Sequence, residues 1–337
     1  MASDFKILDC TLRDGGHVNK WMFGRKAIYD IVYSLYNAKI DIIELGLIKS
    51  GETNLDCTLK SSFAEFDNML EELDLPTHQY YTLMVRPDWL DIDSFHSVVQ
   101  SNHINGVRFA FYPDQINRLR DFVDIAKDHG LDIYLNPVAV STYSDLDLTT
   151  TLSSLVNLSP HAISIVDTFG NLDKKSLPKL FHTFHSHIPD IVNLGIHLHE
   201  NRNLSLELAL SFIELCATRS LSFIDASLLG MGRIPGNLCI ENLLTHLSSD
   251  LNYDFTALLS VIDKHISPIK RCTPWGYSPP YMLSAIYNIN RNYPEFFLDM
   301  NLDTQQINLL LKSLFDLSPS AAFSPTLAKQ LINDLNS

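Results

Sequence analysis

The sequence predicts an α/β fold of the TIM-barrel, or (β/α)₈, class with a helical appendage at its C-terminal end. Over about the first 250 residues, short β-rich segments alternate with longer amphipathic segments. The short segments number eight, which is the strand count of such a barrel. Polar residues end many of these segments, whereas a doubly wound open sheet would gather them at one switch point.

The expected strands are short runs rich in apolar and β-branched residues, and the segments between them place apolar residues at helical spacing. Residues 25–38, 115–130 and 204–219 are examples of the helical pattern. Gly130 gives a helix C-cap signal directly before the next strand. The eight expected strands are residues 5–12, 41–46, 80–85, 106–112, 132–140, 162–168, 193–199 and 223–229.

The chain divides in composition near residue 255. We expect residues 1–255 to form the barrel and residues 256–337 to form a helical extension, because the last part has helical patterns punctuated by prolines. A 337-residue chain exceeds the roughly 250 residues of a typical barrel, so an appendage is expected. The exposed-looking aromatic residues of this extension predict either a cap over the site or a homodimer contact.

Composition excludes several classes of protein. Apolar residues make up 46% and charged residues 19%, as in a globular core. The net charge of -14 argues against a nucleic-acid partner, because phosphate would be repelled. No apolar run reaches the roughly 18 residues of a membrane span, and the first residues lack a signal-peptide pattern. Together with five scattered cysteines, which read as free thiols, this predicts a cytoplasmic protein without a membrane partner.

The strongest chemical signal is the pair His197 and His199 at the end of the seventh expected strand. Alternate residues of a strand point to the same side, so both imidazoles would face the mouth of the barrel, where TIM-barrel sites lie. Two histidines in this arrangement are a common metal motif. Taken alone, a pair of hydrogen-bonded structural histidines fits the pattern equally well.

Two further segments concentrate functional groups at strand ends. Residues 8–17 place Arg13, Asp14 and His17 around a Gly-Gly turn after the first expected strand, although an ordinary loop with a surface ion pair fits this segment equally well. Residues 229–237 form a glycine-rich loop after the eighth strand and end in Asn237, which could offer an oxygen to a metal or cap the next helix.

These three segments follow the first, seventh and eighth strands, which are neighbours in a closed barrel. One aspartate, two histidines and an asparagine would then converge on one point and leave positions open for water and substrate. Mixed oxygen and nitrogen ligation of this kind suits a divalent metal without selecting one. The predicted ligands are Asp14, His197, His199 and Asn237.

The motifs resemble those of the DRE-TIM metallolyase family, which includes HMG-CoA lyase-like and pyruvate carboxyltransferase domains. The resemblance rests on TLRDG (11–15), IIELG (42–46), DTFG (167–170), HLHEN (197–201) and GMGRIPGN with the following Glu241 (230–241). These motifs span the whole expected barrel in the family's order. Among the members, 4-hydroxy-2-oxovalerate aldolase and its relatives fit best, because they share a histidine three residues after the metal-binding aspartate, here His17.

The resemblance implies roles for individual residues. It makes Asp14, His197 and His199 the metal ligands, with Asn237 nearby or fourth, and Mn²⁺ the expected ion, with Mg²⁺, Co²⁺ or Zn²⁺ as alternatives. Arg13 would stabilise an enolate oxygen and His17 would act as a base. A tyrosine of the C-terminal extension would reach over the barrel mouth, and the candidates are Tyr277 and Tyr281.

The implied reaction is aldol cleavage or formation of a 4-hydroxy-2-oxo acid, with a small 2-oxo acid as partner substrate. We expect the substrate to be positioned by Glu44, Arg108, Asp167 and Thr168. For Glu44 and Arg108, an ion pair inside the barrel fits equally well. A Claisen-type acyltransferase using an acyl-CoA is the alternative, and an Fe(II) oxygenase is a more distant one. The extension resembles the aldolase tail only in part, so a dehydrogenase partner is not carried over.

Overall fold

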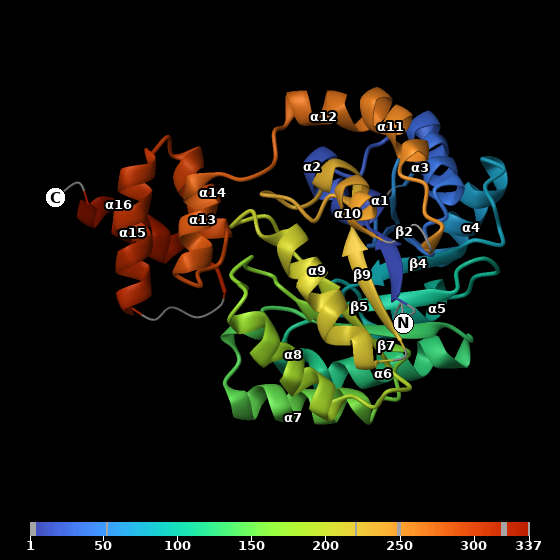
Figure 1. Ribbon diagram of the computed structural model, residues 1–337, viewed down its shortest axis with the longest axis horizontal. Coiled ribbons are helices and arrows are strands. Elements are labelled where there is room, and N and C mark those ends of the chain that lie inside the picture. Colours follow the sequence, from blue (N-terminus) through green and yellow to red (C-terminus); the bar gives the residue numbers. More distant parts are fainter. Residues whose placement is uncertain (1–4, 52, 220, 248–250, 318–321, 336–337) are drawn as a thin grey trace.

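The computed structural model describes residues 5–51, 53–219, 221–247, 251–317 and 322–335 (Figure 1). Within these residues, eight parallel strands close into a barrel, since β1 pairs with both β9 and β2. A short strand, β3, adds to β2 outside the ring. The predicted TIM barrel is therefore confirmed. The strands are β1 (Phe5–Asp9), β2 (Ile42–Ile48), β3 (Leu59–Lys60), β4 (Tyr80–Val85), β5 (Gly106–Phe111), β6 (Asp132–Pro137), β7 (Ala162–Val166), β8 (Asn193–His197) and β9 (Ser222–Ala226).

Amphipathic helices surround the barrel and bury their apolar stripes against it. In α3, for example, Ile28, Ile31 and Leu35 recur at helical spacing and are fully buried in the same core as the outward-facing strand residues. The helices between strands are α3 (Arg25–Asn37), α4 (Phe63–Glu72), α5 (Ile92–Val98), α6 (Ile116–Asp128), α7 (Asp145–Val156), α8 (Ser176–His187) and α9 (Ser205–Leu215), and α10 (Ile240–His246) follows β9.

Several expected strands end earlier than the sequence pattern indicates. The first ends at Asp9 rather than residue 12, because the Asp9 carboxylate accepts hydrogen bonds from the Thr11 amide (3.0 Å) and hydroxyl (2.7 Å) and starts a helical turn, α1 (Thr11–Asp14). A second turn, α2 (Gly16–Asn19), follows. The fifth expected strand behaves similarly: β6 stops at Pro137, and Ala139 adopts a left-handed conformation with φ of 56°.

The C-terminal region has two parts. Helices α11 (Thr256–Val261) and α12 (Ser267–Cys272), joined by a π-helical turn (Ile262–Ile266), pack against the barrel, and Leu258 is part of its apolar core. The boundary expected at residue 255 thus precedes helices that share the barrel core. A second apolar core, which includes Tyr293 and Phe297, unites α13 (Pro279–Ile286), α14 (Asn292–Asp299), α15 (Thr304–Leu317) and α16 (Pro325–Leu335) beside the barrel (Figure 1).

No helix of the described residues has the length and apolarity to cross a membrane.

Candidate metal centre

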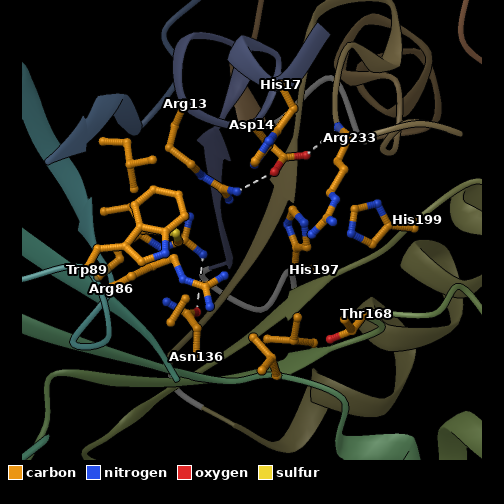
Figure 2. Close-up of a pocket in the computed structure, with 16 residues that line it drawn as sticks. Arg13, Asp14, His17, Arg86, Trp89, Asn136, Thr168, His197, His199 and Arg233 are labelled. Carbon is orange, nitrogen blue, oxygen red and sulfur yellow. Dashed lines mark hydrogen bonds and ion pairs between the residues drawn. The ribbon is translucent and has the colours of Figure 1, made fainter. Parts of the chain in front are cut away.

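Asp14, His197 and His199 meet at the C-terminal end of the barrel. One ligand atom from each lies within 4.8 Å of the others. Asp14 ends the turn α1, His197 is the last residue of β8, and His199 pairs in an isolated bridge with Asn237 of the loop after β9. Figure 2 shows the three side chains directed toward one another at the wall of the pocket. The convergence expected from the sequence is thus present in the fold.

Hydrogen bonds leave one nitrogen of each histidine free. His197 Nδ1 lies 2.9 Å from Asp225 Oδ2, and His199 Nδ1 lies 3.1 Å from the Gly236 carbonyl oxygen. Because an ionised carboxylate and a carbonyl only accept, Nδ1 carries the proton in the neutral form of each ring, and Nε2 then keeps its lone pair. Burial, and then the neighbouring His197, lowers the pKa of His199 to about 3, so its imidazole is neutral near pH 7. Neutral imidazoles anchored in this way are typical metal ligands.

The Asp14 carboxylate is held ionised by its surroundings. Burial alone would raise its pKa, but Arg13 and then the nearby histidines hold the pKa well below its usual range. Arg13 Nη1 donates to Oδ1 at 2.5 Å, and Asn237 Nδ2 donates to Oδ2 at 2.8 Å. Gly232 permits this approach, since a Cβ there would lie 2.6 Å from Asp14 Oδ2. The carboxylate is therefore fixed in place as an anionic ligand.

Asn237 supplies the fourth candidate donor. Its side chain is buried, and its Oδ1 has no hydrogen-bond partner among the described residues. A buried amide oxygen without a partner is costly unless a bound group satisfies it. The carboxylate and two imidazole nitrogens that lie within 4.8 Å of one another fit a divalent cation with open positions, while Asn237 turns its Nδ2 toward Asp14 and keeps its Oδ1 unpaired.

A buried chain of charged residues supports this centre from below. Glu44 Oε2 accepts from Arg13 Nε (2.7 Å) and from Arg108 Nη1 (3.0 Å), and Arg108 Nη2 donates to Asp225 Oδ2 at 2.5 Å. Asp225 in turn holds His197. The internal ion pair expected between Glu44 and Arg108 is thus present, while Arg108 also lines the pocket. These pairings fix the orientation of both Arg13 and His197.

The remaining predicted site residues lie in different places. His17 and Thr168 line the same pocket as the metal cluster. Asp167 is buried outside the lining, where its Oδ1 accepts from the amides of Asn171 (2.9 Å) and Leu172 (3.2 Å). Burial raises the pKa of Asp167 to about 7.

The structure does not bring the two predicted tyrosines into the pocket lining. Tyr277 is 52% exposed, and Tyr281 is buried in α13, where its carbonyl oxygen accepts from Asn201 Nδ2 at 3.2 Å. Asn201 lies two residues after His199, so Tyr281 contacts the loop that carries this histidine through its backbone.

Sequence reasoning missed several residues of the pocket. Arg86 and Trp89 after β4, Asn136 in β6 and Arg233 after β9 all line it, together with an apolar wall (Figure 2). Asp225, which orients His197, was also missed. The available signal was position, because each stands at or just beyond the C-terminal end of a strand. The apolar wall consists of Leu47, Met84, Ala110, Val138 and Val166.

Comparison with known sequences identifies the family. The HMGL-like family model matches residues 4–264. The chain is 21% identical to 2-isopropylmalate synthase of Saccharolobus solfataricus over 75% of its length, and 26% identical to homocitrate synthase of Pyrococcus horikoshii over 72%. Each match spans only 64% of the synthase. The chain is also 22% identical to 4-hydroxy-2-oxovalerate aldolase of Roseiflexus castenholzii, over 80% of this chain and 79% of the aldolase.

Solved structures agree with this assignment. The N-terminal domain of a provisionally named aldolase from Bacteroides vulgatus superposes with a TM-score of 0.76 at 26% identity, over 87% of this chain and 96% of that one. The HMG-CoA lyase of Brucella melitensis shares the fold with a TM-score of 0.63 at 17% identity, over 80% of this chain and 100% of that one. The chain therefore belongs to the HMGL-like, or DRE-TIM, family of enzymes.

Proposed function

We propose that the protein is a divalent-metal-dependent carbon–carbon lyase that cleaves a 4-hydroxy-2-oxo acid into pyruvate and an aldehyde, or joins them. The observation that carries this proposal is the meeting of a metal-type donor set with Arg13 and His17 in one pocket. Mn²⁺ is the ion we propose, with Mg²⁺, Co²⁺ or Zn²⁺ as alternatives. Bound by Asp14, His197 and His199, it would supply Lewis-acid stabilisation of the enolate that aldol chemistry requires.

Arg13 would stabilise the same developing negative charge. Its guanidinium is fixed by Glu44 on one side and Asp14 on the other, so it needs no reorganisation during the reaction. A preorganised donor of this kind is typically worth roughly 3 kcal/mol in the transition state. Trp21 holds the backbone of Arg13, because its Nε1 donates to the Arg13 carbonyl oxygen at 2.7 Å.

His17 would serve as the general base. In cleavage its imidazole takes the proton of the C4 hydroxyl, the C3–C4 bond breaks to give the aldehyde, and the bonding electrons remain on the pyruvate fragment as its enolate. In condensation the same proton returns to the new hydroxyl. The His17 ring packs edge-on against Trp21, with 4.7 Å between ring centroids. Trp21 therefore supports both Arg13 and His17.

The alternative is a Claisen-type acyltransferase that condenses an acyl-CoA with a 2-oxo acid. It is kept because the synthase relatives are as similar in sequence as the aldolase relatives. Two features favour the aldolase. His17 lines the pocket beside Arg13, and the aldolase match covers 79% of the relative, against 64% for the synthases.

The proposal is tested with purified protein and a series of 4-hydroxy-2-oxo acids, Mn²⁺ being added and pyruvate detected. We expect His17→Ala to lower kcat by about 10²–10⁴ while Mn²⁺ affinity stays unchanged, because the base touches the hydroxyl and not the ion. His129→Ala, at the exposed C-terminal end of α6, is the matched control with unchanged activity. Equal loss of turnover and Mn²⁺ binding in His17→Ala would make His17 structural.

The same preparation separates the two reactions. Release of free thiol from acetyl-CoA in the presence of a 2-oxo acid, without pyruvate formation from any hydroxy-oxo acid, would replace the aldolase by the acyltransferase.

A further inference from the structure

The pocket carries more positive than negative charge, although the whole chain has a net charge of -14. Four arginines line it, against one carboxylate, that of Asp14. Three of these arginines already have carboxylate partners within salt-bridge distance. The pairs are Arg13 with Asp14 and Glu44, Arg108 with Glu44 and Asp225, and Arg86 with Asp88.

The fourth arginine, Arg233, differs from the others. Its guanidinium contacts the neutral Asn292, whose Oδ1 accepts from Nη2 at 2.9 Å. Among the described residues, no carboxylate lies within 4.0 Å of its guanidinium. A second cation, Arg291, lies nearby: burial, and then the charge of Arg233, lowers the pKa of Arg291 to about 10. The Arg233 charge is therefore left without an anion, and a like charge stands beside it.

Arg233 is also fixed directly at the metal cluster. Its backbone amide donates to Asp14 Oδ2 at 3.1 Å. Figure 2 shows its guanidinium beside the imidazole rings of His197 and His199. An anionic group placed between a cation bound by Asp14, His197 and His199 and this guanidinium would be attracted by both positive charges. Charge-assisted, bidentate pairing with a carboxylate is the geometry that a guanidinium favours.

The helical extension holds this arginine from outside the barrel. Asn292 begins α14 and Arg291 precedes it, and the Arg291 guanidinium donates to the carbonyl oxygen of Ile234, the residue after Arg233. Arg291 is kept in turn by Glu295 at 3.1 Å. Two successive residues of the extension thus contact two successive residues of the loop after β9. Asn292 binds the side chain of Arg233, and Arg291 binds the backbone of Ile234.

We infer that Arg233 binds the carboxylate group of the 2-oxo acid, and that Asn292 of the helical extension is the positioning residue that holds Arg233 in place while leaving it uncompensated. The inference rests on the proposed function, because that function supplies the 2-oxo acid. It gives the extension a part in the active site without placing any of its own side chains on the substrate. An asparagine suits this role, since an aspartate would neutralise the guanidinium before substrate arrives.

The experiment measures pyruvate binding to the full chain by calorimetry in the presence of saturating Mn²⁺. We expect Arg233→Gln to raise the Kd for pyruvate by about 10- to 100-fold, the range for losing a hydrogen bond to a charged group, while the Kd for Mn²⁺ changes by less than about threefold. Asn292→Asp supplies the missing carboxylate in the same shape, so it should raise the pyruvate Kd although it touches no ligand. Arg271→Gln, exposed on α12, controls for net charge.

A neutral ligand sharpens the measurement. Wild-type protein should prefer pyruvate to methyl pyruvate, and that preference should shrink in Arg233→Gln and in Asn292→Asp alike. If Asn292 is merely structural, the isosteric aspartate keeps the contact and pyruvate binds as in wild type, which overturns the inference. Equal pyruvate affinity in wild type and Arg233→Gln also overturns it. Failure of the wild-type protein to bind any 2-oxo acid would instead contradict the proposed function.

Discussion

The two ends of the barrel are both rich in polar residues, yet among the described residues only the C-terminal end groups side chains that could hold a metal ion. The N-terminal end holds Tyr80, Asp132, Tyr134, His161 and Asn193, which resemble in kind the residues at the C-terminal end. Tyr80 Oη donates to Asp132, and Tyr134 Oη donates to Tyr80 Oη at 3.2 Å. Both ends therefore contain a histidine, a carboxylate and hydrogen-bonded neighbours.

The difference lies in which donor and acceptor positions remain unused. At the N-terminal end both nitrogens of His161 have partners: Nδ1 lies 3.4 Å from Asp132 and Nε2 lies 3.2 Å from Asn193 Nδ2. At the C-terminal end the hydrogen bonds of His197 and His199 use Nδ1, which leaves Nε2 of each ring available, and a ligand atom of each lies within 4.8 Å of one from Asp14. Convergent unused lone pairs, rather than polar residues as such, distinguish the candidate metal centre.

Removing the free nitrogens of the metal centre should have the largest effect on metal binding and activity. The double variant His197→Ala with His199→Ala should lose Mn²⁺ binding and lower the retro-aldol rate by at least about 10³-fold, because two of three strong donors are gone. The free energy of unfolding should change by less than about 2 kcal/mol, since neither ring fills the apolar core. Metal content and pyruvate release are the measurements.

The matched control lies at the opposite end of the barrel. His161→Ala removes a histidine whose two nitrogens are already paired, so it should leave kcat and Mn²⁺ affinity within about twofold and lower stability by about 1–2 kcal/mol. If the double variant kept its metal and its activity, the ligand assignment would be wrong. If His161→Ala abolished metal binding, the contrast between the ends would not hold.

A smaller effect is expected from the residue that orients His197. Asp225→Asn keeps the shape of the side chain but removes the charge that holds the Nδ1 proton and pairs with Arg108. Loss of such a partner behind a metal ligand typically lowers metal affinity by about 10- to 100-fold. Titration of the variant with Mn²⁺ checks this, with Asp132→Asn at the other end as the control. An unchanged Kd for Mn²⁺ would mean that His197 needs no such support.

Sequence reasoning predicted the strands and the convergence of Asp14, His197 and His199 because both depend on short-range patterns. The alternation of His197 and His199 and their position at a strand end follow from spacing alone. The helical turn from Thr11 to Asp14 was not predicted, because it depends on the Asp9 carboxylate accepting from Thr11 rather than on residue spacing. A strand pattern predicts that a strand is present more reliably than it predicts the residue at which the strand ends.

Contacts between distant segments could not be predicted in the same way. Arg233 and Asn292 are 59 positions apart, and their contact exists only because α14 packs beside the loop after β9. A pocket lining that draws on most of the barrel strands has the same cause: each residue is ordinary in its own segment, and the fold brings them together. Asp167 illustrates the converse, since a polar residue after a strand faced its own loop.

Asp167 yields the smallest predicted effect and one that depends on pH. Burial raises its folded pKa to about 7, above the unfolded value of about 3.9, so the folded state binds the extra proton between these values. Stability from this group is therefore complete below about pH 4 and is lost as pH rises toward 7.

Asp167→Asn cannot ionise, so between pH 5 and pH 7.5 it should lose less stability than the wild type, by at least about 1 kcal/mol in urea titrations. Because Asp167 does not line the pocket, KM should stay within about twofold. If KM rose tenfold and the stability of wild type and variant changed equally with pH, Asp167 would instead bind substrate, as its sequence position suggested.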